Sequence, residues 1–206
     1  MKYIITFLML LTSVALSAQS AATIMDKSVD VYKKSNGMTA KFTVKYHSAK
    51  ENRTETSDGI MNMKDNKFSF QTSDIMVWFD GKTQWSYLLN SEEVNITTPT
   101  EKDLLSSNPM AIMQSYKKHF RVEYNSDASS SVYNIVLTPK QKDDITKVEM
   151  RINKFTYIQE LIAITTKDGN VCTIALKDVK TKVNQPNNSF VFDEEQFPDV
   201  EIIDLR

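Results

Sequence analysis

Apolar and polar residues alternate along most of this chain, and this alternation limits the possible folds more than any other feature of the sequence. Between Met38 and His47, for example, every second residue is apolar. A half-buried β-strand has this period of two, because successive side chains point to opposite faces of a sheet. The same pattern recurs at 61–63, 68–70, 85–89, 94–96, 120–124, 133–137, 148–152, 158–164, 172–176 and 190–192. The chain is therefore predicted to be mainly β.

Turn signals lie between these segments. Each of the four glycines follows Asn or Asp, at Gly37, Gly59, Gly81 and Gly169. Such pairs favour tight turns, because they tolerate the positive φ that hairpin turns require. Strands joined by short turns without an intervening helix must be antiparallel. No linker-like block or internal repeat interrupts the pattern, so the sequence predicts a single domain built on one large, strongly curved antiparallel sheet.

Two regions depart from the strand pattern and indicate helices. Residues 21–36 carry apolar side chains at helical spacing, with Ser20 as a suitable N-cap and Asn36-Gly37 as a suitable end. Residues 98–119 are predicted to form two short helices, the second with Asn108 as its N-cap and Pro109 in its first turn. The expected fold class is therefore α+β, with one N-terminal helix and two mid-chain helices.

The N-terminus has the features of a secretory signal peptide. Lys2 precedes an apolar stretch of about 14 residues, and the small residues Ser17 and Ala18 follow it. A helix that spans a bilayer needs roughly 20 apolar residues, so cleavage is favoured over a retained membrane anchor. We expect residues 1–18 to be the signal peptide and residues 19–206 the single domain, with the mature chain beginning between Gln19 and Thr23. In a Gram-negative cell the destination would be the periplasm.

Charge and residue chemistry exclude several classes of function. The formal net charge is −1, and no Lys/Arg run is long enough to hold a duplex, so nucleic acid is not an expected partner. Two His and one Cys leave too few ligands for a zinc site and allow no disulfide within the chain. The sequence also lacks a Gly-x-Ser-x-Gly elbow, a Gly-rich phosphate loop and a His-Glu-x-x-His pair. We therefore expect no catalytic residues, no metal and no cofactor.

A binding function is favoured by the surplus of apolar strand faces. Three short helices cover only part of a large apolar sheet face, and Met side chains suit sites that accept flexible apolar groups. The residues expected to line such a lipid-binding cavity are Phe42, Val44, Met61, Met63, Phe68, Phe70, Trp78, Trp85 and Tyr87. The alternative interpretation is that the same residues simply fill the core of a barrel.

Four segments resemble one family in order and spacing. They are residues 80–87 (DGKTQWSY), residues 59–64 with 68–70 (GIMNMK and FSF), residues 136–140 (VLTPK), and residues 190–192 with 197–206 (FVF and FPDVEIIDLR). Together they are similar to the LolA-like family of outer-membrane lipoprotein carrier proteins, over nearly the whole chain after the signal peptide.

The resemblance implies an unclosed β-barrel lidded by helices. It also implies a monomeric periplasmic chaperone that shelters the acyl chains of lipoproteins without a cofactor. Its partners would be acylated lipoproteins, an inner-membrane lipoprotein-releasing ABC transporter and an outer-membrane acceptor. The alternative function is a periplasmic sensor or binding protein for lipid or another hydrophobic ligand.

The mid-chain helices would then form the lid. Met110, Met113 and Tyr116 share one stripe of the second helix, which is expected to cover the cavity mouth, either as a movable lid or as a permanent core helix. In the family an Arg holds this lid closed, but Asp65-Asn66 stand at that place here. Lys64 and Lys67 are the candidate latch cations in its stead, although an ammonium lacks the two-pronged guanidinium donor.

Overall fold

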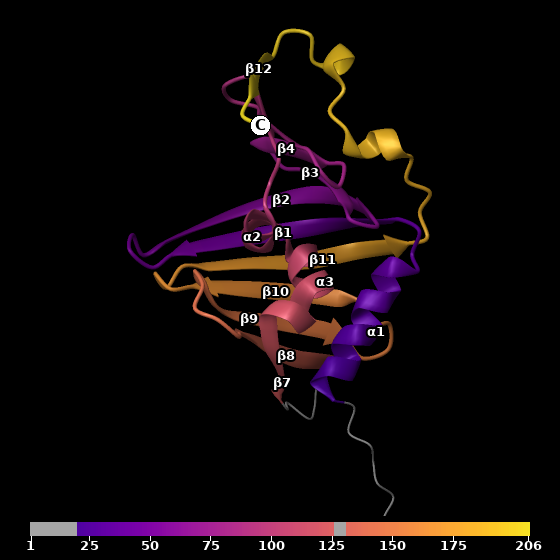
Figure 1. The fold of residues 1–206 in the computed structure, drawn as a ribbon, viewed down its shortest axis with the longest axis vertical. Coiled ribbons are helices and arrows are strands. Elements are labelled where there is room, and N and C mark those ends of the chain that lie inside the picture. The colour runs from indigo at the N-terminus through magenta and orange to yellow at the C-terminus, as the bar shows by residue number, and fades with distance from the viewer. Residues whose placement is uncertain (1–19, 126–130) are drawn as a thin grey trace, which may run out of the picture.

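A computed structural model describes residues 20–125 and 131–206, so the expected signal peptide lies outside the described residues. Within these ranges twelve strands form one curled, unclosed sheet (Figure 1). Their order across the sheet is β12-β6-β5-β4-β3-β2-β1-β11-β10-β9-β8-β7. Every neighbouring pair is antiparallel except β12 and β6, which run parallel. The predicted antiparallel sheet is confirmed, and the parallel β12 was not expected.

The strands have the following bounds: β1 (Met38–Ser48), β2 (Arg53–Lys64), β3 (Lys67–Gln71), β4 (Ile75–Phe79), β5 (Gln84–Leu88), β6 (Glu93–Thr97), β7 (Phe120–Asn125), β8 (Val132–Pro139), β9 (Ile145–Asn153), β10 (Gln159–Thr166), β11 (Val171–Thr181) and β12 (Glu201–Asp204).

The three helices are α1 (Ala21–Lys33), α2 (Glu101–Ser107) and α3 (Pro109–His119). Two of them, α1 and α3, begin at the caps that the sequence indicates. The Ser20 hydroxyl accepts a hydrogen bond from the Thr23 amide at the start of α1. The Asn108 side chain accepts one from Met110 at the start of α3, where Pro109 has no N–H to satisfy. Figure 1 shows all three helices on the same face of the sheet, which is called the inner face below.

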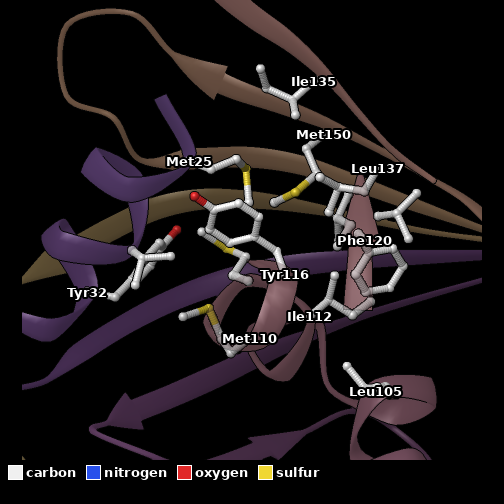
Figure 2. Packing of buried hydrophobic residues seen from close by; sticks show 14 of the residues in the cluster. Met25, Tyr32, Leu105, Met110, Ile112, Tyr116, Phe120, Ile135, Leu137 and Met150 are labelled. Carbon is white, nitrogen blue, oxygen red and sulfur yellow. The ribbon is translucent and has the colours of Figure 1, made fainter. Parts of the chain in front are cut away.

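The hydrophobic core lies between these helices and the inner face. In Figure 2, Tyr116 and Ile112 of α3 and Met25 of α1 lie among Leu137 and Met150 of the sheet. Met25, Ile112, Leu137 and Met150 are essentially inaccessible to solvent. At roughly 25 cal/mol per Å² of apolar surface removed from water, this burial holds α1 and α3 on the sheet.

The segment after β11 differs from the prediction. Residues 190–192 were expected to form a strand, but Phe190 ends a 3₁₀ helix (Asn187–Phe190), and a second one follows at Glu194–Gln196. Figure 1 shows this C-terminal segment, in yellow, leaving β11 and passing the upper strands to reach β12. Two apolar residues at period two are too few to specify a strand when a neighbouring sheet offers both of them a buried site.

The described residues contain neither a helix suited to span a membrane nor a cluster suited to bind a metal ion. No helix there combines the length and apolar character needed to cross a bilayer. The same ranges hold no group of three His, Cys, Asp or Glu side chains arranged to bind a metal ion.

Candidate functional site

An apolar cavity of about 420 Å³ opens on the inner face. Strands β1, β2, β3 and β11 form its walls, and Asn108 and Pro109, at the junction of α2 and α3, close one side. Its volume lies within the range of roughly 300–1,000 Å³ typical of small-ligand pockets. Five residues predicted to line a cavity do so: Phe42, Val44, Met61, Phe68 and Phe70.

The strand register explains why these five side chains converge. Met61 on β2 lies opposite Phe70 on β3, and Val44 on β1 lies opposite Ile174 on β11. Side chains directly opposite one another project from the same face of a sheet. The Phe42 ring meets the Phe70 ring edge-on, with 6.0 Å between centroids, which is a favourable aromatic geometry. The cavity therefore has an aromatic wall.

Gly59 makes room for this wall. Asp58-Gly59 does not form the predicted turn, because Gly59 lies inside β2. A Cβ at this position would lie 2.3 Å from the Gln71 carbonyl oxygen and 2.5 Å from the Phe42 ring. The residue is glycine because two neighbouring groups occupy the space of a side chain, not because the backbone turns.

We expect Gly59→Ala to destabilise the protein by about 1 to 3 kcal/mol, because the Phe42 ring and the β3 backbone must move apart. Urea unfolding measures this change, with Thr56→Ala, an exposed position on the same strand, as the control. A stability equal to that of the control variant would show that the contact does not constrain Phe42.

Met63 is on the predicted face but not in the cavity. It lies opposite Met38 and Phe68 and is buried in the core beneath the helices. Its expected place in the cavity wall is therefore wrong, although its face was correctly assigned.

Trp78, Trp85 and Tyr87 lie on the opposite face of the sheet, so their predicted place in the cavity is wrong. Trp78 is paired with Ser69 and Trp85, which puts it on the other side from Phe68 and Phe70. The three residues pack instead with Val94, Ile96, Phe192, Phe197 and Val200 in a separate cluster, called the outer cluster below. Phe192 and Phe197 lie 5.5 and 6.0 Å from the Trp78 ring. The C-terminal segment thus covers this second apolar face.

The predicted lid stripe of α3 is buried. Met110, Met113 and Tyr116 are all nearly inaccessible and belong to the main core. The Tyr116 hydroxyl donates to Asp26 Oδ1 at 2.8 Å and ties α3 to α1. Burial, reinforced by the hydrogen bond to the Asp26 carboxylate, raises the pKa of Tyr116. A hydrogen bond from Lys117 is the largest of the effects that lower the pKa of Asp26, so this tie is charge-assisted.

Among the described residues, neither candidate latch cation forms a hydrogen bond or an ion pair with α3. Lys64 Nζ donates to the Gln185 carbonyl at 2.9 Å, and Lys67 Nζ donates to Asn187 Oδ1 at 3.1 Å, so both hold the C-terminal segment. The polar contact between α3 and the turn after β2 comes instead from Gln114, whose Nε2 donates to the Asp65 carbonyl at 3.1 Å. Sequence reasoning missed Gln114, because an exposed amide in a helix carries no signal of its partner.

Some residues that line the cavity were not predicted, and they differ in whether the sequence could have revealed them. Ile174 and Cys172 could have been found, because they continue the apolar alternation of β11. The polar residue Ser57 could not be found, because a polar residue on a strand is expected on the solvated face, and Thr72 and Asp74 lie in the turn between β3 and β4, where alternation assigns no face.

Cys172 lines the cavity, so the alkylation rate of its thiol can report on access to the cavity. It is the chain's single cysteine, and burial raises the pKa of its thiol. Since the thiolate is the reactive form, we expect maleimide to alkylate the native protein more slowly than a free cysteine at pH 8, and faster as the pH rises. A hydrophobic ligand in the cavity should slow the reaction further. Reaction at the rate of a free thiol, unchanged by ligand, would place Cys172 outside the cavity.

Comparisons with known proteins identify the family of the chain and support its fold. A family model described as outer membrane lipoprotein carrier protein LolA matches residues 11–170. An uncharacterized conserved protein from Thermus thermophilus has a similar structure, with a TM-score of 0.57 and 13% identity over 89% of this chain and 98% of that one. A DUF1329 family protein from Desulfovibrio piger has a TM-score of 0.50, with 10% identity over 87% and 99% of the two chains.

A LolA superfamily protein from Nitrosomonas europaea aligns with a TM-score of 0.48 and 10% identity, over 84% of this chain and 98% of that chain. A comparison with curated protein sequences gives no significant match. The structural similarities concern the fold, whereas the family model covers more than three quarters of the sequence and includes three of the four segments that carry the resemblance, at 59–70, 80–87 and 136–140. The chain belongs to the LolA family of outer membrane lipoprotein carrier proteins.

Proposed function

We propose that this protein shelters lipoprotein acyl chains in the inner-face cavity and carries them through the periplasm from the inner to the outer membrane. The observation that carries the proposal is the apolar cavity beside α3, walled by Phe42, Met61 and Phe70. Export would depend on residues 1–18. The donor would be an inner-membrane lipoprotein-releasing ABC transporter, and an outer-membrane acceptor would receive the cargo.

The energetics of acyl chains explain the need for such a carrier. At about 0.8 kcal/mol for each buried CH₂, a chain of about 16 carbons costs roughly 12 kcal/mol to expose to water. Unassisted diffusion between membranes is therefore negligible. A carrier must also release its cargo, and a cavity that is widened by displacing packed helices binds more weakly than its apolar area suggests.

Mass spectrometry of the protein purified from its native cells tests the proposal. We expect co-purifying acylated lipoproteins, lost when Val44 is replaced by Asp in the cavity wall. Retention of phospholipid or fatty acid alone, without lipoprotein, would contradict the carrier function and favour the lipid-sensor alternative.

The Gln114 contact predicts how the lid behaves. If α3 moves to widen the cavity, Gln114→Ala removes its polar contact with the Asp65 carbonyl, and we expect faster loading of a fluorescent lipopeptide with little change in stability. Lys67→Ala, which removes a contact with the C-terminal segment, is the control and should leave the loading rate unchanged. Equal loading rates for Gln114→Ala and the unaltered protein would indicate that α3 is a permanent core helix and not a movable lid.

A further inference from the structure

The cavity wall contains one buried hydroxyl that the described residues do not bind. Ser57 on β2 lies opposite Val44 on β1, and both line the cavity. Its Oγ is shielded from solvent and has no hydrogen-bond partner in the described part of the chain. Ser28 Oγ and Gln159 Oε1 share this property, but neither of them lines the cavity.

Other polar groups at the cavity are engaged in local structure. The Thr72 hydroxyl accepts hydrogen bonds from the amides of Asp74 and Ile75, and so shapes the turn before β4. Asn108 Oδ1 accepts from the Met110 amide as the cap of α3. The oxygens of Thr72 and Asn108 therefore have partners in the backbone, whereas the Ser57 hydroxyl has none among the described residues.

A buried hydroxyl among apolar side chains is costly unless it finds a partner, and it has one proton to donate. An aliphatic chain offers no acceptor, but the carbonyl oxygen of an acyl ester or amide does. We propose that Ser57 binds this carbonyl oxygen, so that the cavity selects acyl esters and amides over plain hydrocarbon. This inference rests on the proposed function and adds to it the group that positions the ligand.

The register gives the direction of the bound chain. Ser57, Gly59 and Met61 alternate along the inner face of β2, and a strand rises about 3.3 Å per residue. A chain whose carbonyl lies at Ser57 therefore runs about 13 Å along β2 to reach Met61. Beside Gly59 it passes over the Phe42 ring, which fills the space of the missing side chain, and it then meets the Phe70 ring. The carbonyl end is held by a hydrogen bond, and the rest of the chain by apolar contact alone.

Competition for a cavity-bound dye tests this inference on the purified protein. The dye is 1-anilinonaphthalene-8-sulfonate, and the competitors are methyl dodecanoate and tetradecane, which differ chiefly in the ester group. We expect Ser57→Ala to lower the affinity for methyl dodecanoate about two- to tenfold, the value of one hydrogen bond, and to leave that for tetradecane unchanged. Ser57→Thr, which keeps the hydroxyl, should retain the ester affinity.

Ser86→Ala is the matched control. Ser86 also projects from the inner face, but its hydroxyl accepts a hydrogen bond from Gln84 and does not line the cavity. Equal affinity for methyl dodecanoate in Ser57→Ala and the unaltered protein would overturn the inference and leave the proposed function intact. An equal loss of affinity for methyl dodecanoate and for tetradecane would do the same. If neither competitor displaces the dye from the unaltered protein, the proposed function fails together with the inference.

Discussion

Replacing Val44 by Asp is expected to reduce binding of acyl probes by at least about a hundredfold. Val44 lies in the middle of the cavity wall, opposite Ile174 and Ser57. A carboxylate there must either lose its hydration when an acyl chain enters or keep water in the cavity, and both outcomes oppose binding. Titration with a fluorescent acyl probe measures the loss.

Lys45→Asp is the control for this variant. Lys45 follows Val44 on β1, so its side chain projects from the opposite face, where it is exposed. The same carboxylate placed one residue away should leave the affinity within about twofold, since a solvated surface charge contributes little. Equal losses from the two variants would contradict the assignment of faces on β1.

The second large effect is expected in the outer cluster. Phe192 is only 7% exposed and packs against the rings of Trp78 and Phe197. We expect Phe192→Ala to lower the free energy of unfolding by about 3 to 5 kcal/mol, the usual cost of removing a buried phenyl ring. Acyl-probe binding should persist wherever the variant is folded, because the outer cluster lies on the opposite face from the cavity.

Tryptophan fluorescence during urea unfolding is well suited to this measurement, since both tryptophans of the chain, Trp78 and Trp85, belong to the outer cluster. Phe155→Ala is the control. Phe155 is 85% exposed in the turn between β9 and β10, so its removal should change the stability by less than about 0.5 kcal/mol. A loss below about 1 kcal/mol for Phe192→Ala would show that the C-terminal segment is only loosely held.

The sequence was sufficient to predict the sheet and the helices because their signals are local. Period-two alternation marks β1 and β8 to β11, and Ser20 and Asn108 mark the starts of α1 and α3. The sequence could not predict that β12 would lie parallel to β6. This contact joins segments about 100 residues apart and depends on the path of the C-terminal segment.

The candidate site was predicted only where one face of a strand is polar. On β1, polar residues alternate with Phe42 and Val44, so the buried face is unambiguous. On β4 both alternating sets are apolar, with Ile75 and Val77 on one face and Met76 and Trp78 on the other. Periodicity cannot say which of two apolar faces meets the cavity, and the larger aromatic residues proved to lie on the other one.

Long-range polar contacts also could not be predicted from the sequence. Lys64 and Lys67 are near the turn where the family has its latch, yet both side chains extend to the C-terminal segment. The charge of a side chain can be read from the sequence, but its partner depends on which segment lies closest to it in the fold.

Photo-crosslinking of a bound lipid tests the central claim most directly. The probe is a diacylated lipopeptide with a diazirine in one acyl chain, bound to the purified protein, irradiated and mapped by peptide mass spectrometry. We predict adducts on β1, β2, β3 and β11, at or beside Phe42, Met61, Phe70 and Ile174. Adducts concentrated on Trp78, Trp85 and Tyr87, or spread evenly over the surface, would contradict the account, because the acyl chain would then lie outside the inner-face cavity.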